Sequence, residues 1–407
     1  MMTASFFPLL AALGWFLVLY PALLSLALIV ASAWHILRHG DRSAPEPPRW
    51  PTLVLLVPAC DEEATIGACL EALLAADYPR VEIHILSDGS TDGTVRVARR
   101  YAARGVRVRD FAVNRGKQAV LEDALAFVET ELVMVVDADS RPARDALREL
   151  VKPFADPAIA GVTGNLLVAA RGFFQHLQAM EYASIIGLQK RANSVWGGLF
   201  TVSGAACCFR AEAVRRVGGF ASHSVTEDIE LSWRLQHAGE GLAYAPRALV
   251  EIQAPSGVRA LWQQRARWSR GLGEVLWQHG AVWRSGRKCL AIFAIEAVLS
   301  GVWLLLLTGA TVWMIGAAIR DGLWVPDFNP RWFIATLAIF MAQSISAWLY
   351  EAHYTHSPAW RLLLALLYPI YFAVIVWPSS LIGWASSLRR TPAARWRRTS
   401  RDELAAA

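Results

Sequence analysis

The sequence predicts an α/β domain that folds in water and is inserted between transmembrane helices. The chain of 407 residues is 55% hydrophobic, with a mean hydropathy of +0.33 and 18 tryptophans, which is too apolar for an ordinary soluble protein. The segment from about Trp50 to Lys288 is an exception, because it is polar and alternates strand-like with helix-like stretches. Its length of about 230 residues suits a single α/β domain.

The N-terminal segment is predicted to be a membrane anchor. Residues 1–37 contain no Asp, Glu, Lys or Arg, and about twenty such residues are enough to span a hydrocarbon core. A cleaved signal peptide would carry basic residues ahead of a shorter apolar core, whereas here Arg38 and Arg42 follow the apolar run. We therefore expect an uncleaved transmembrane anchor over 1–37, with its N-terminus outside and Arg38 inside.

Three further apolar runs follow residue 288. They cover 289–319, with Glu296 as the only charged residue, 332–350 and 362–388. The positive-inside rule places the polar segment in the cytoplasm, because basic residues flank it on both sides: Arg38, Arg42, Arg284, Arg287 and Lys288. The predicted organisation is an anchor (1–37), a cytoplasmic domain (50–255), an interfacial segment (256–288), a transmembrane region of about three hydrophobic segments (289–388) and a basic tail (389–407).

The sequence leaves open on which side of the membrane the basic tail lies. Three simple crossings after the domain would put its arginines outside, against the positive-inside rule. In the alternative, Pro369 and Pro378 break the last run into a re-entrant or interfacial piece, which returns the tail to the cytoplasm.

Charge and cysteine content limit the expected partners. The net charge is +6 and the pI about 9.2, but the basic residues cluster beside apolar runs. We therefore expect membrane lipids with anionic headgroups as partners and no nucleic acid. The five cysteines form no C-x-x-C pair and give no zinc signature. Cys207 and Cys208 are expected to be small buried apolar residues.

The first half of the domain alternates strands and helices. The run "TLVLLVPA" at 52–59 is typical of a buried parallel strand, and helical periodicity follows it. The next strand, "VEIHILSD" at 81–88, is followed by a polar turn and a helix. A short strand at 106–111, a helix from about Gly116 and a strand ending in "VVDADS" complete the pattern. This is a doubly wound order, in which ligands bind beyond the carboxyl ends of the strands.

Acidic residues stand at those ends. Asp61, Glu62 and Glu63 follow the first strand, Asp88 ends the second, and Asp137 and Asp139 close the fourth. No G-x-G-x-x-G or G-x-x-x-x-G-K occurs, so neither a dinucleotide site nor a P-loop is expected. An acidic pocket can still hold a diphosphate when a hard divalent cation lies between them.

The string "DAD" supplies a candidate site for such a cation. Side chains two apart on an extended segment point to the same side, so Asp137 and Asp139 can both face a metal and a diphosphate ligand. The alternative is a pair of carboxylates in a solvated turn. The position at the end of an apolar strand, with Asp88 at the end of its neighbour, favours the metal site.

The string "VTEDIELSW" at 225–233 opens a predicted helix. Ser224 and Glu227 have capping-box spacing, and acidic residues suit a helix N-terminus. This leaves Asp228 available for chemistry. A helix N-terminus helps to keep a carboxylate ionised near neutral pH, as a general base requires.

Seven motifs, in order, resemble those of the membrane-bound family 2 glycosyltransferases, which include cellulose, chitin and hyaluronan synthases. They are "VPACDEE", "SDGSTDGT", "NRGKQAVLEDAL", "VVDADS", "TVSGAACCFR", "VTEDIELSW" and "QQRARWSRG", and they cover most of 52–275. The stretches "SIIGLQKR", "FTVSG" and "GLGEVL" are most similar to the poly-N-acetylglucosamine synthases of bacterial biofilm polysaccharide. The resemblance implies a Rossmann-like nucleotide-sugar domain of the GT-A type between transmembrane helices of the bacterial inner membrane.

The resemblance also implies a role for each motif residue. Donor binding would fall to Asp61, Glu62, Asp88, Lys117, Asp137 and Asp139, with Asp88 on the uracil of a UDP-sugar and both Asp137 and Asp139 holding the diphosphate and its Mg²⁺ or Mn²⁺. Asp228 would be the general base. The acceptor and diphosphate side would comprise Ser203, Gly204, Glu227, Gln264, Arg267 and Trp268. Two features depart from the family pattern: Ser87, where many members have Asp, and the pair Cys207-Cys208 in the acceptor-side motif.

The segment "QQRARWSRG" at 263–271 joins the domain to the membrane region, where a polymer has to leave the active site. Arg267 can neutralise charge on the leaving group, and Trp268 offers a flat apolar face for a sugar ring. The alternative is a membrane-surface helix whose Arg and Trp side chains lie at headgroup level. We expect that position for Arg259, Arg265 and Arg270, and for the amphipathic stretch 173–191.

The expected function is a processive inverting transferase that polymerises N-acetylglucosamine from UDP-GlcNAc into a β-linked exopolysaccharide and passes it through its own membrane region. The alternative is a non-processive transferase that adds one sugar from a UDP-sugar to a membrane lipid. A catalytically idle scaffold is disfavoured, because all the motif carboxylates are present. The resemblance further implies a small membrane accessory subunit and cyclic di-GMP as partners.

Overall fold

The first strand, β1 (Leu53–Ala59), is buried along its whole length. In the computed structural model, which describes residues 6–220, 224–280, 282, 286–321, 330–355 and 359–389, this strand has a parallel neighbour on each side. Successive residues of a strand face opposite sides of its sheet. Leu53 and Leu55 accordingly pack into one hydrophobic core, and Val54 and Leu56 into a second one. Both faces are covered, which explains the unbroken apolar sequence.

The described residues form a sheet of eight strands in the order β3-β2-β1-β4-β7-β6-β8-β5. The other strands are β2 (Val81–Asp88), β3 (Val106–Phe111), β4 (Leu132–Val136), β5 (Arg141–Pro142), β6 (Ile159–Val168), β7 (Ala206–Arg210) and β8 (Gly241–Ile252). Strands β3, β2, β1 and β4 run parallel, whereas β7 is antiparallel to both β4 and β6. The predicted doubly wound half is confirmed, and a mixed half continues it on the far side of β4.

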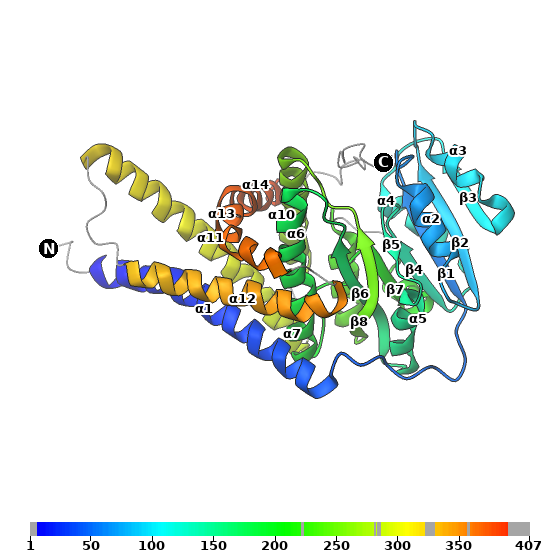
Figure 1. Cartoon of the computed structure of the whole chain (residues 1–407), viewed down its shortest axis with the longest axis horizontal. Helices are drawn as coiled ribbons and strands as arrows, with labels where there is room; N and C mark the ends of the chain where they lie inside the picture. Colours follow the sequence, from blue (N-terminus) through cyan, green and yellow to red (C-terminus); the bar gives the residue numbers. More distant parts are fainter. Residues whose placement is uncertain are drawn as a thin grey trace.

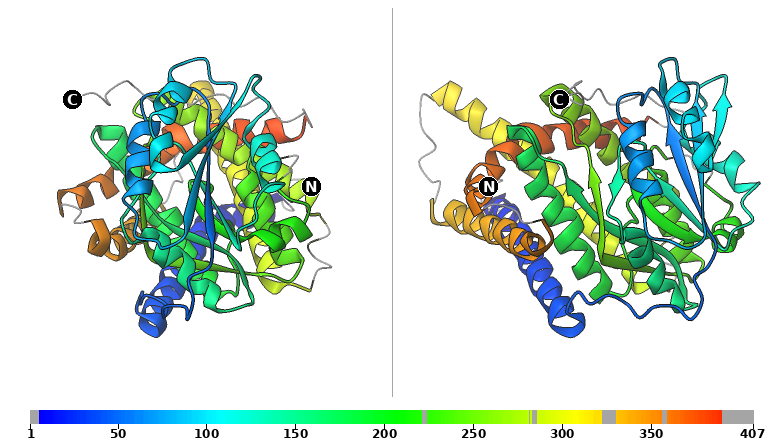
Figure 2. Two further views of the ribbon diagram at one scale, coloured as in Figure 1. Left: turned by 90° about the vertical axis from the view of Figure 1, so that its right-hand side faces the viewer. Right: turned by 45° about the vertical axis from the view of Figure 1, so that its right-hand side comes forward.

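Helices cover both faces of this sheet (Figures 1 and 2). They are α2 (Ile66–Leu74), α3 (Thr94–Arg99), α4 (Lys117–Leu125), α5 (Ala146–Val151), α8 (Ala211–Arg216) and α9 (Glu227–His237), with 3-10 turns at Ala102–Arg104 and Lys152–Ala155. Helix α2 buries Ile66 and Leu70 in the core of Leu53, and α4 buries Val120 in the core of Val54. The helices predicted after the first three strands are therefore confirmed.

A continuous helical run separates the sheet from the membrane helices (Figure 2). It consists of α6 (Phe173–Tyr182), a π-helical turn η3 (Ala183–Leu188) and α7 (Gln189–Val195). It contacts β6 on one side and the long helices α1 (Phe6–His39) and α12 (Pro330–Thr355) on the other. Polar side chains within it are buried, including Gln178, Glu181, Lys190 and Arg191. The prediction that 173–191 lies on the membrane surface is wrong for most of this stretch, because protein covers it from both sides.

Among the described residues, three helical segments are long and apolar enough to cross a membrane: Ala12–His39, Lys288–Arg320 and Tyr368–Ser387. The second belongs to α11 (Lys288–Asp321), and α12 lies beside α1 (Figure 1). Ser25 of α1 donates to Oε1 of Gln343 of α12 over 2.5 Å. The predicted apolar helices on both sides of the domain are confirmed. The number of crossings and the cytoplasmic position of the domain stay predictions.

The last apolar run is not one uniform helix. A 3-10 segment η5 (Ala359–Leu366) precedes α13 (Tyr368–Tyr371), a π-helical turn (Phe372–Val376) and α14 (Trp377–Ser387). Pro369 and Pro378 stand in the first turns of α13 and α14, where a missing N–H costs least. Helix α14 packs on α10 (Val258–Gln278), and a Cβ at Gly383 would collide with the Ala266 carbonyl oxygen. Tail residues 390–407 lie outside the described part of the chain.

Candidate active site

A cavity of about 350 Å³ lies beyond the carboxyl ends of β1 and β4 and is bounded by α9 and α10. Its lining includes most of the residues singled out from the sequence: Glu62, Lys117, Asp137, Asp139, Ser203, Gly204, Glu227, Asp228, Gln264, Arg267 and Trp268. These come from segments up to about 200 positions apart. Asp61 and Asp88 do not line the cavity and instead hold the loops around it.

Asp88 and Asp61 each organise a loop through backbone N–H groups. The two carboxylate oxygens of Asp88 accept from Arg115 N and Gly116 N, both over 2.7 Å. Gly116 has φ +97°, a conformation that L side chains rarely adopt. Asp61 Oδ1 accepts from Thr91 N over 2.7 Å. Asp88 thus fixes the backbone conformation of the loop that leads into α4. Its contact with uracil stays a prediction.

Lys117 joins two acidic residues across the cavity. Its Nζ lies 2.8 Å from Asp137 Oδ1 and 2.8 Å from Glu227 Oε1. Burial alone would lower the pKa of Lys117, but the two carboxylates raise it well above its usual value. The lysine is therefore a permanent positive charge between the end of β4 and the start of α9. It balances part of the acidic lining, which would otherwise repel a diphosphate.

Asp137 and Asp139 lie in the turn after β4, with both residues lining the cavity. The Asp137 side chain is about one-third exposed and Asp139 is buried. Among the described residues, no group of three or more His, Cys, Asp or Glu side chains forms a closed metal site. Mg²⁺ is commonly held by one or two carboxylates together with substrate phosphates and water. The pair fits such an open site, which a bound diphosphate would complete.

Glu62 lies beside this pair in the lining and is itself buried. Its Oε2 accepts from Thr65 Oγ1 over 2.7 Å, and its backbone N donates to Thr94 Oγ1 over 2.7 Å. These contacts fix Glu62 between the turn that follows β1 and the start of α3. A direct contact with the donor stays a prediction.

Asp228 combines burial with two backbone hydrogen bonds. Oδ2 accepts from Gly204 N over 3.0 Å, and Oδ1 accepts from Ile229 N over 2.9 Å. Burial and the neighbouring Glu227 carboxylate raise the pKa of Asp228 to about 6, against the opposing effects of Lys117 and the two N–H groups. Such a carboxylate is ionised at neutral pH and still basic enough to accept a proton, which suits a general base.

The start of α9 differs in one detail from the expected capping box. Thr226 occupies the N-cap position, and no side chain caps the helix there. Ser224 Oγ instead donates to the Gly271 carbonyl, and the Glu227 side chain pairs with Lys117. The capping-box interpretation of Ser224 and Glu227 is therefore wrong. Ser224 ties α9 to α10, and Glu227 belongs to the cavity.

Helix α10 supplies the side of the cavity that faces the membrane helices. Trp268 packs edge-on against Tyr182, with ring centroids 6.1 Å apart. The Arg265 guanidinium lies 4.2 Å from the Trp268 centroid, and its Nη1 donates to Gln264 Oε1 over 2.7 Å. Arg267, in contrast, is exposed and lines the cavity. Trp268 is thus held by neighbours on one side and contributes to the cavity wall.

The prediction that Arg265 lies at headgroup level is wrong. The side chain is 3% exposed and forms a 2.5 Å ion pair with Glu181 of α6, which also accepts from Tyr371 Oη over 2.8 Å. Arg259 is exposed, whereas Arg270 is partly buried and pairs with Glu274. A buried guanidinium is stable here because a carboxylate on a neighbouring helix compensates its charge.

Sequence reasoning missed the polar residues behind the cavity. Lys190 of α7 is buried and donates to Ser203 Oγ and to Thr163 Oγ1 of β6. Tyr182 lines the cavity beside Trp268. Lys190 stands in the stretch "SIIGLQKR", which an amphipathic pattern assigned to the membrane surface. A buried polar face against a sheet produces the same pattern, so only the fold separates the two cases.

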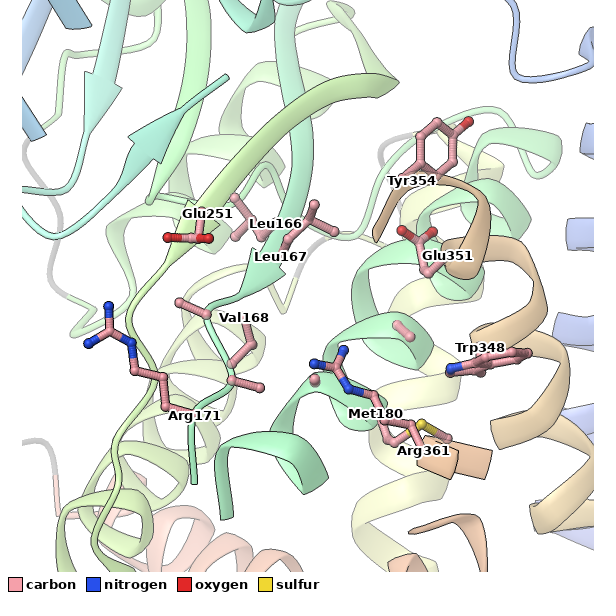
Figure 3. Close-up of a pocket in the computed structure, with 14 residues that line it drawn as sticks. Leu166, Leu167, Val168, Arg171, Met180, Glu251, Trp348, Glu351, Tyr354 and Arg361 are labelled. Carbon is pink, nitrogen blue, oxygen red and sulfur yellow. The ribbon is translucent and has the colours of Figure 1, made fainter. Parts of the chain in front are cut away.

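A second cavity of about 420 Å³ lies between the ends of β6 and β8 and the helices α6 and α12. In Figure 3, Leu166, Val168 and Glu251 on the strand side face Trp348 and Glu351 on the helix side. None of the motif residues is among its lining residues in the described part of the chain. Glu351 forms a 2.7 Å ion pair with Arg191 of α7. Leu166 is the one lining residue that this cavity shares with the candidate active site in the described part of the chain.

The sequence is similar to a glycosyltransferase family model and to named synthases. The family model described as "Glycosyltransferase like family 2" matches residues 48–271, more than half of the chain. A poly-β-1,6-N-acetyl-D-glucosamine synthase of Staphylococcus epidermidis is 29% identical over 391 residues, covering 92% of this chain and 94% of the relative. A synthase of the same name from Staphylococcus aureus is 31% identical over 298 residues, covering 71% of this chain and 72% of the relative.

Among solved structures, a mannosyltransferase from Pyrobaculum calidifontis, determined with GDP-mannose and Mn²⁺, is similar with a TM-score of 0.64. It is 21% identical, and the match covers 91% of this chain and 98% of that one. The likeness confirms the predicted GT-A-like fold with flanking helices. The chain is therefore a glycosyltransferase and belongs to the glycosyltransferase-like family 2.

Proposed function

We propose that this enzyme polymerises N-acetylglucosamine from UDP-GlcNAc into a β-linked polysaccharide by an inverting mechanism. One observation carries the proposal: a buried carboxylate with a raised pKa, Asp228, shares a cavity with an acidic pair suited to a metal-bound diphosphate and with an aromatic wall. The names of the relatives support N-acetylglucosamine as the sugar.

In the proposed reaction, Asp228 takes the proton of an acceptor hydroxyl while that oxygen attacks the anomeric carbon of the donor sugar. The bond from this carbon to the diphosphate oxygen breaks, and its electron pair leaves with UDP. A single displacement of this kind inverts the anomeric configuration, so an α-linked donor gives a β-linked product. A single displacement needs only one base, and the raised pKa of Asp228, about 6, suits that role.

The leaving diphosphate needs compensating charge. A divalent cation held by Asp137 and Asp139 would supply this charge, and the similar mannosyltransferase structure contains Mn²⁺ together with GDP-mannose. From the chain itself, Arg267 lines the cavity and Lys117 remains charged at every physiological pH. A guanidinium matches the geometry of a phosphate group well. We therefore assign Arg267 and Lys117 to the diphosphate.

The acceptor is expected on the α10 side. Trp268 offers an apolar ring in the cavity wall, and carbohydrate rings pack on such faces. Ser203 and Gly204 also line the cavity, and Gly204 donates its N–H to Asp228. Helix α10 packs on α14, so this side of the cavity adjoins the membrane region through which the polymer would pass. We propose a cytoplasmic catalytic domain at the inner membrane of a bacterium, so that synthesis and export occur at one place.

A small membrane subunit and cyclic di-GMP stay expectations from the family resemblance. The alternative activity, transfer of a single sugar to a membrane lipid, shares the same donor site and base. The two differ only in what occupies the acceptor side.

The test of this function is a panel of labelled UDP-sugars incubated with membranes that contain the protein and either Mg²⁺ or Mn²⁺. UDP-GlcNAc alone should give a labelled product, and that product should be a long polymer. Transfer from a different UDP-sugar would overturn the choice of substrate. A short lipid-linked product from UDP-GlcNAc would favour the alternative.

A further inference from the structure

Lys190 lies directly behind the proposed active site, and the reaction described above does not use it. The residue is 2% exposed. Its Nζ donates to Ser203 Oγ over 2.6 Å and to Thr163 Oγ1 over 2.9 Å. Both partners are neutral hydroxyls, and no carboxylate of the described residues lies within ion-pair distance. A lysine is almost never buried without a carboxylate partner, so this arrangement calls for a function.

The contacts of Lys190 hold one short turn at two points. Thr163 Oγ1 accepts from Lys190 and also from the backbone N of Ser203, over 3.0 Å. The side chain of Ser203 is held by Lys190 directly. The next residue, Gly204, donates its N–H to Asp228 Oδ2. Lys190 therefore supports the turn that presents both a cavity-lining hydroxyl and the N–H on the general base.

The charge of Lys190 also decides which way the Ser203 hydroxyl can point. An ammonium group donates hydrogen bonds and cannot accept them. Ser203 Oγ must therefore act as an acceptor toward a charged Lys190, which leaves its own O–H to donate elsewhere. Ser203 lines the cavity, and no described residue accepts from this hydroxyl. A neutral amine would accept that hydrogen and turn the donor away from the cavity.

Several groups face Lys190 and influence its charge. Asp228 on α9 favours the ammonium, whereas burial raises the pKa of the neighbouring Cys207 thiol on β7 well above its usual value and keeps that thiol neutral. The Tyr244 ring on β8 has its centroid 5.9 Å from Nζ. Arg191, the next residue on α7, directs its guanidinium to carboxylates on the membrane side. Burial is the largest influence and lowers the pKa of Lys190 to about 7.

We propose that Lys190 is a positioning residue of the acceptor side, which fixes the Ser203 hydroxyl as a hydrogen-bond donor toward a sugar oxygen and keeps the Gly204 N–H on Asp228. The group recognised is an oxygen acceptor of the bound carbohydrate, either a hydroxyl or an amide carbonyl. This inference rests on the proposed transfer reaction and assigns part of its substrate recognition.

The test compares wild type, Lys190→Met, Ser203→Ala and the double variant in membranes supplied with UDP-GlcNAc and Mg²⁺ or Mn²⁺. Each single variant should lower kcat by about three- to tenfold, the loss expected for one hydrogen bond. UDP affinity should stay unchanged, because neither residue is assigned to the donor. Since both residues act through the same hydroxyl, the double variant should be no slower than the slower single variant.

The pH profile separates this role from mere structural support. Wild-type kcat should fall as pH rises above about 7, where Lys190 loses its proton. Both Lys190→Met and Ser203→Ala should lose this alkaline limb, since the first has no amine and the second has no hydroxyl to turn away. Lys152→Met is the matched control. Lys152 also donates to a serine hydroxyl, Ser43 Oγ over 2.7 Å, but it pairs with Glu149 and does not line the cavity, so its loss should leave the limb in place.

An alkaline limb that persists in Lys190→Met, or losses in kcat that multiply in the double variant, would overturn the proposal. If Lys190→Met fails to fold, Lys190→Gln provides the same test, because the amide does not titrate and must also remove the limb. Absence of sugar transfer by the wild type from any UDP-sugar would count against the proposed function itself. Normal transfer with an unaltered limb in the variants would count against Lys190 alone.

Discussion

The backbone N–H of Gly204 donates a hydrogen bond of 3.0 Å to Oδ2 of Asp228. The contact joins the loop before β7 to the first turn of α9, two segments that the proposed mechanism assigns to acceptor and base. A Cβ at position 204 would lie 3.3 Å from both Asp228 Oδ2 and Lys117 Nζ. A side chain here would press its Cβ against both the base and the lysine, so glycine fits the position with the least crowding.

The first prediction concerns pH. The raised pKa of Asp228, about 6, means that the base is ionised above this pH and protonated below it. The rate of sugar transfer at saturating donor should therefore rise with pH through about 6 and fall about tenfold per pH unit on the acid side. Initial rates between pH 4.5 and 7 measure this limb. A rate that stays constant down to pH 4.5 would remove Asp228 from proton transfer.

The second prediction concerns the metal. Asp139→Ala should lose both turnover and metal-dependent affinity for UDP, because carboxylates near a diphosphate repel it without a bridging cation. Asp145→Ala, an exposed aspartate outside the cavity, is the control and should bind UDP normally. Calorimetric titration with UDP in Mg²⁺, Mn²⁺ or EDTA measures the effect. Full activity in excess EDTA would contradict the assigned site.

The third prediction concerns Trp268. Trp268→Ala should shorten or abolish the polymer while UDP release from the donor continues, since the ring lies on the acceptor side and the loss of sugar contact costs about 1 kcal/mol. Trp277→Ala on the same helix is the control, because Trp277 is exposed and away from the cavity. Gel separation of products alongside a UDP-release assay gives both readings. Loss of UDP binding with normal chain length would place Trp268 in the donor site.

The fourth prediction concerns stability. Glu181→Ala leaves the Arg265 guanidinium buried without its carboxylate, which should lower the free energy of unfolding by about 3–5 kcal/mol. The exposed Glu129 provides a matched control, and Glu129→Ala should change stability little. Thermal unfolding in detergent measures both variants. An unchanged midpoint for Glu181→Ala would show that the ion pair does not stabilise the fold.

The parallel half of the sheet could be predicted because each element is local. The run at 52–59 forms β1, and Glu62 after β1 meets Asp137 and Asp139 after β4 in one cavity because parallel strands end at a common edge. The mixed half could not be predicted in the same way. Strand β7 pairs with β4 and β6 across long stretches of sequence, and no short-range pattern encodes such a partner.

The burial of charged side chains around the site could not be predicted from the sequence. The sequence pattern predicts that Arg265 and Lys190 are surface residues of amphipathic helices. Inside the protein, however, Arg265 forms an ion pair with Glu181, and Lys190 donates hydrogen bonds to two hydroxyls. Their partners lie on other elements, so burial follows from tertiary packing alone. Asp88 shows the converse, since a strand-end position predicted its place but not that both oxygens bind backbone N–H groups.

The measurement that tests the central claim most directly is polymer formation from labelled UDP-GlcNAc by wild type and Asp228→Asn, with UDP affinity measured on the same preparations. The substitution keeps the shape of the side chain and removes its basicity. Wild type should make a long labelled polymer, whereas Asp228→Asn should be slower by about 10² to 10⁴ with UDP affinity nearly unchanged. Near-normal polymer synthesis by Asp228→Asn would contradict the assignment of Asp228 as the base on which the proposed mechanism depends.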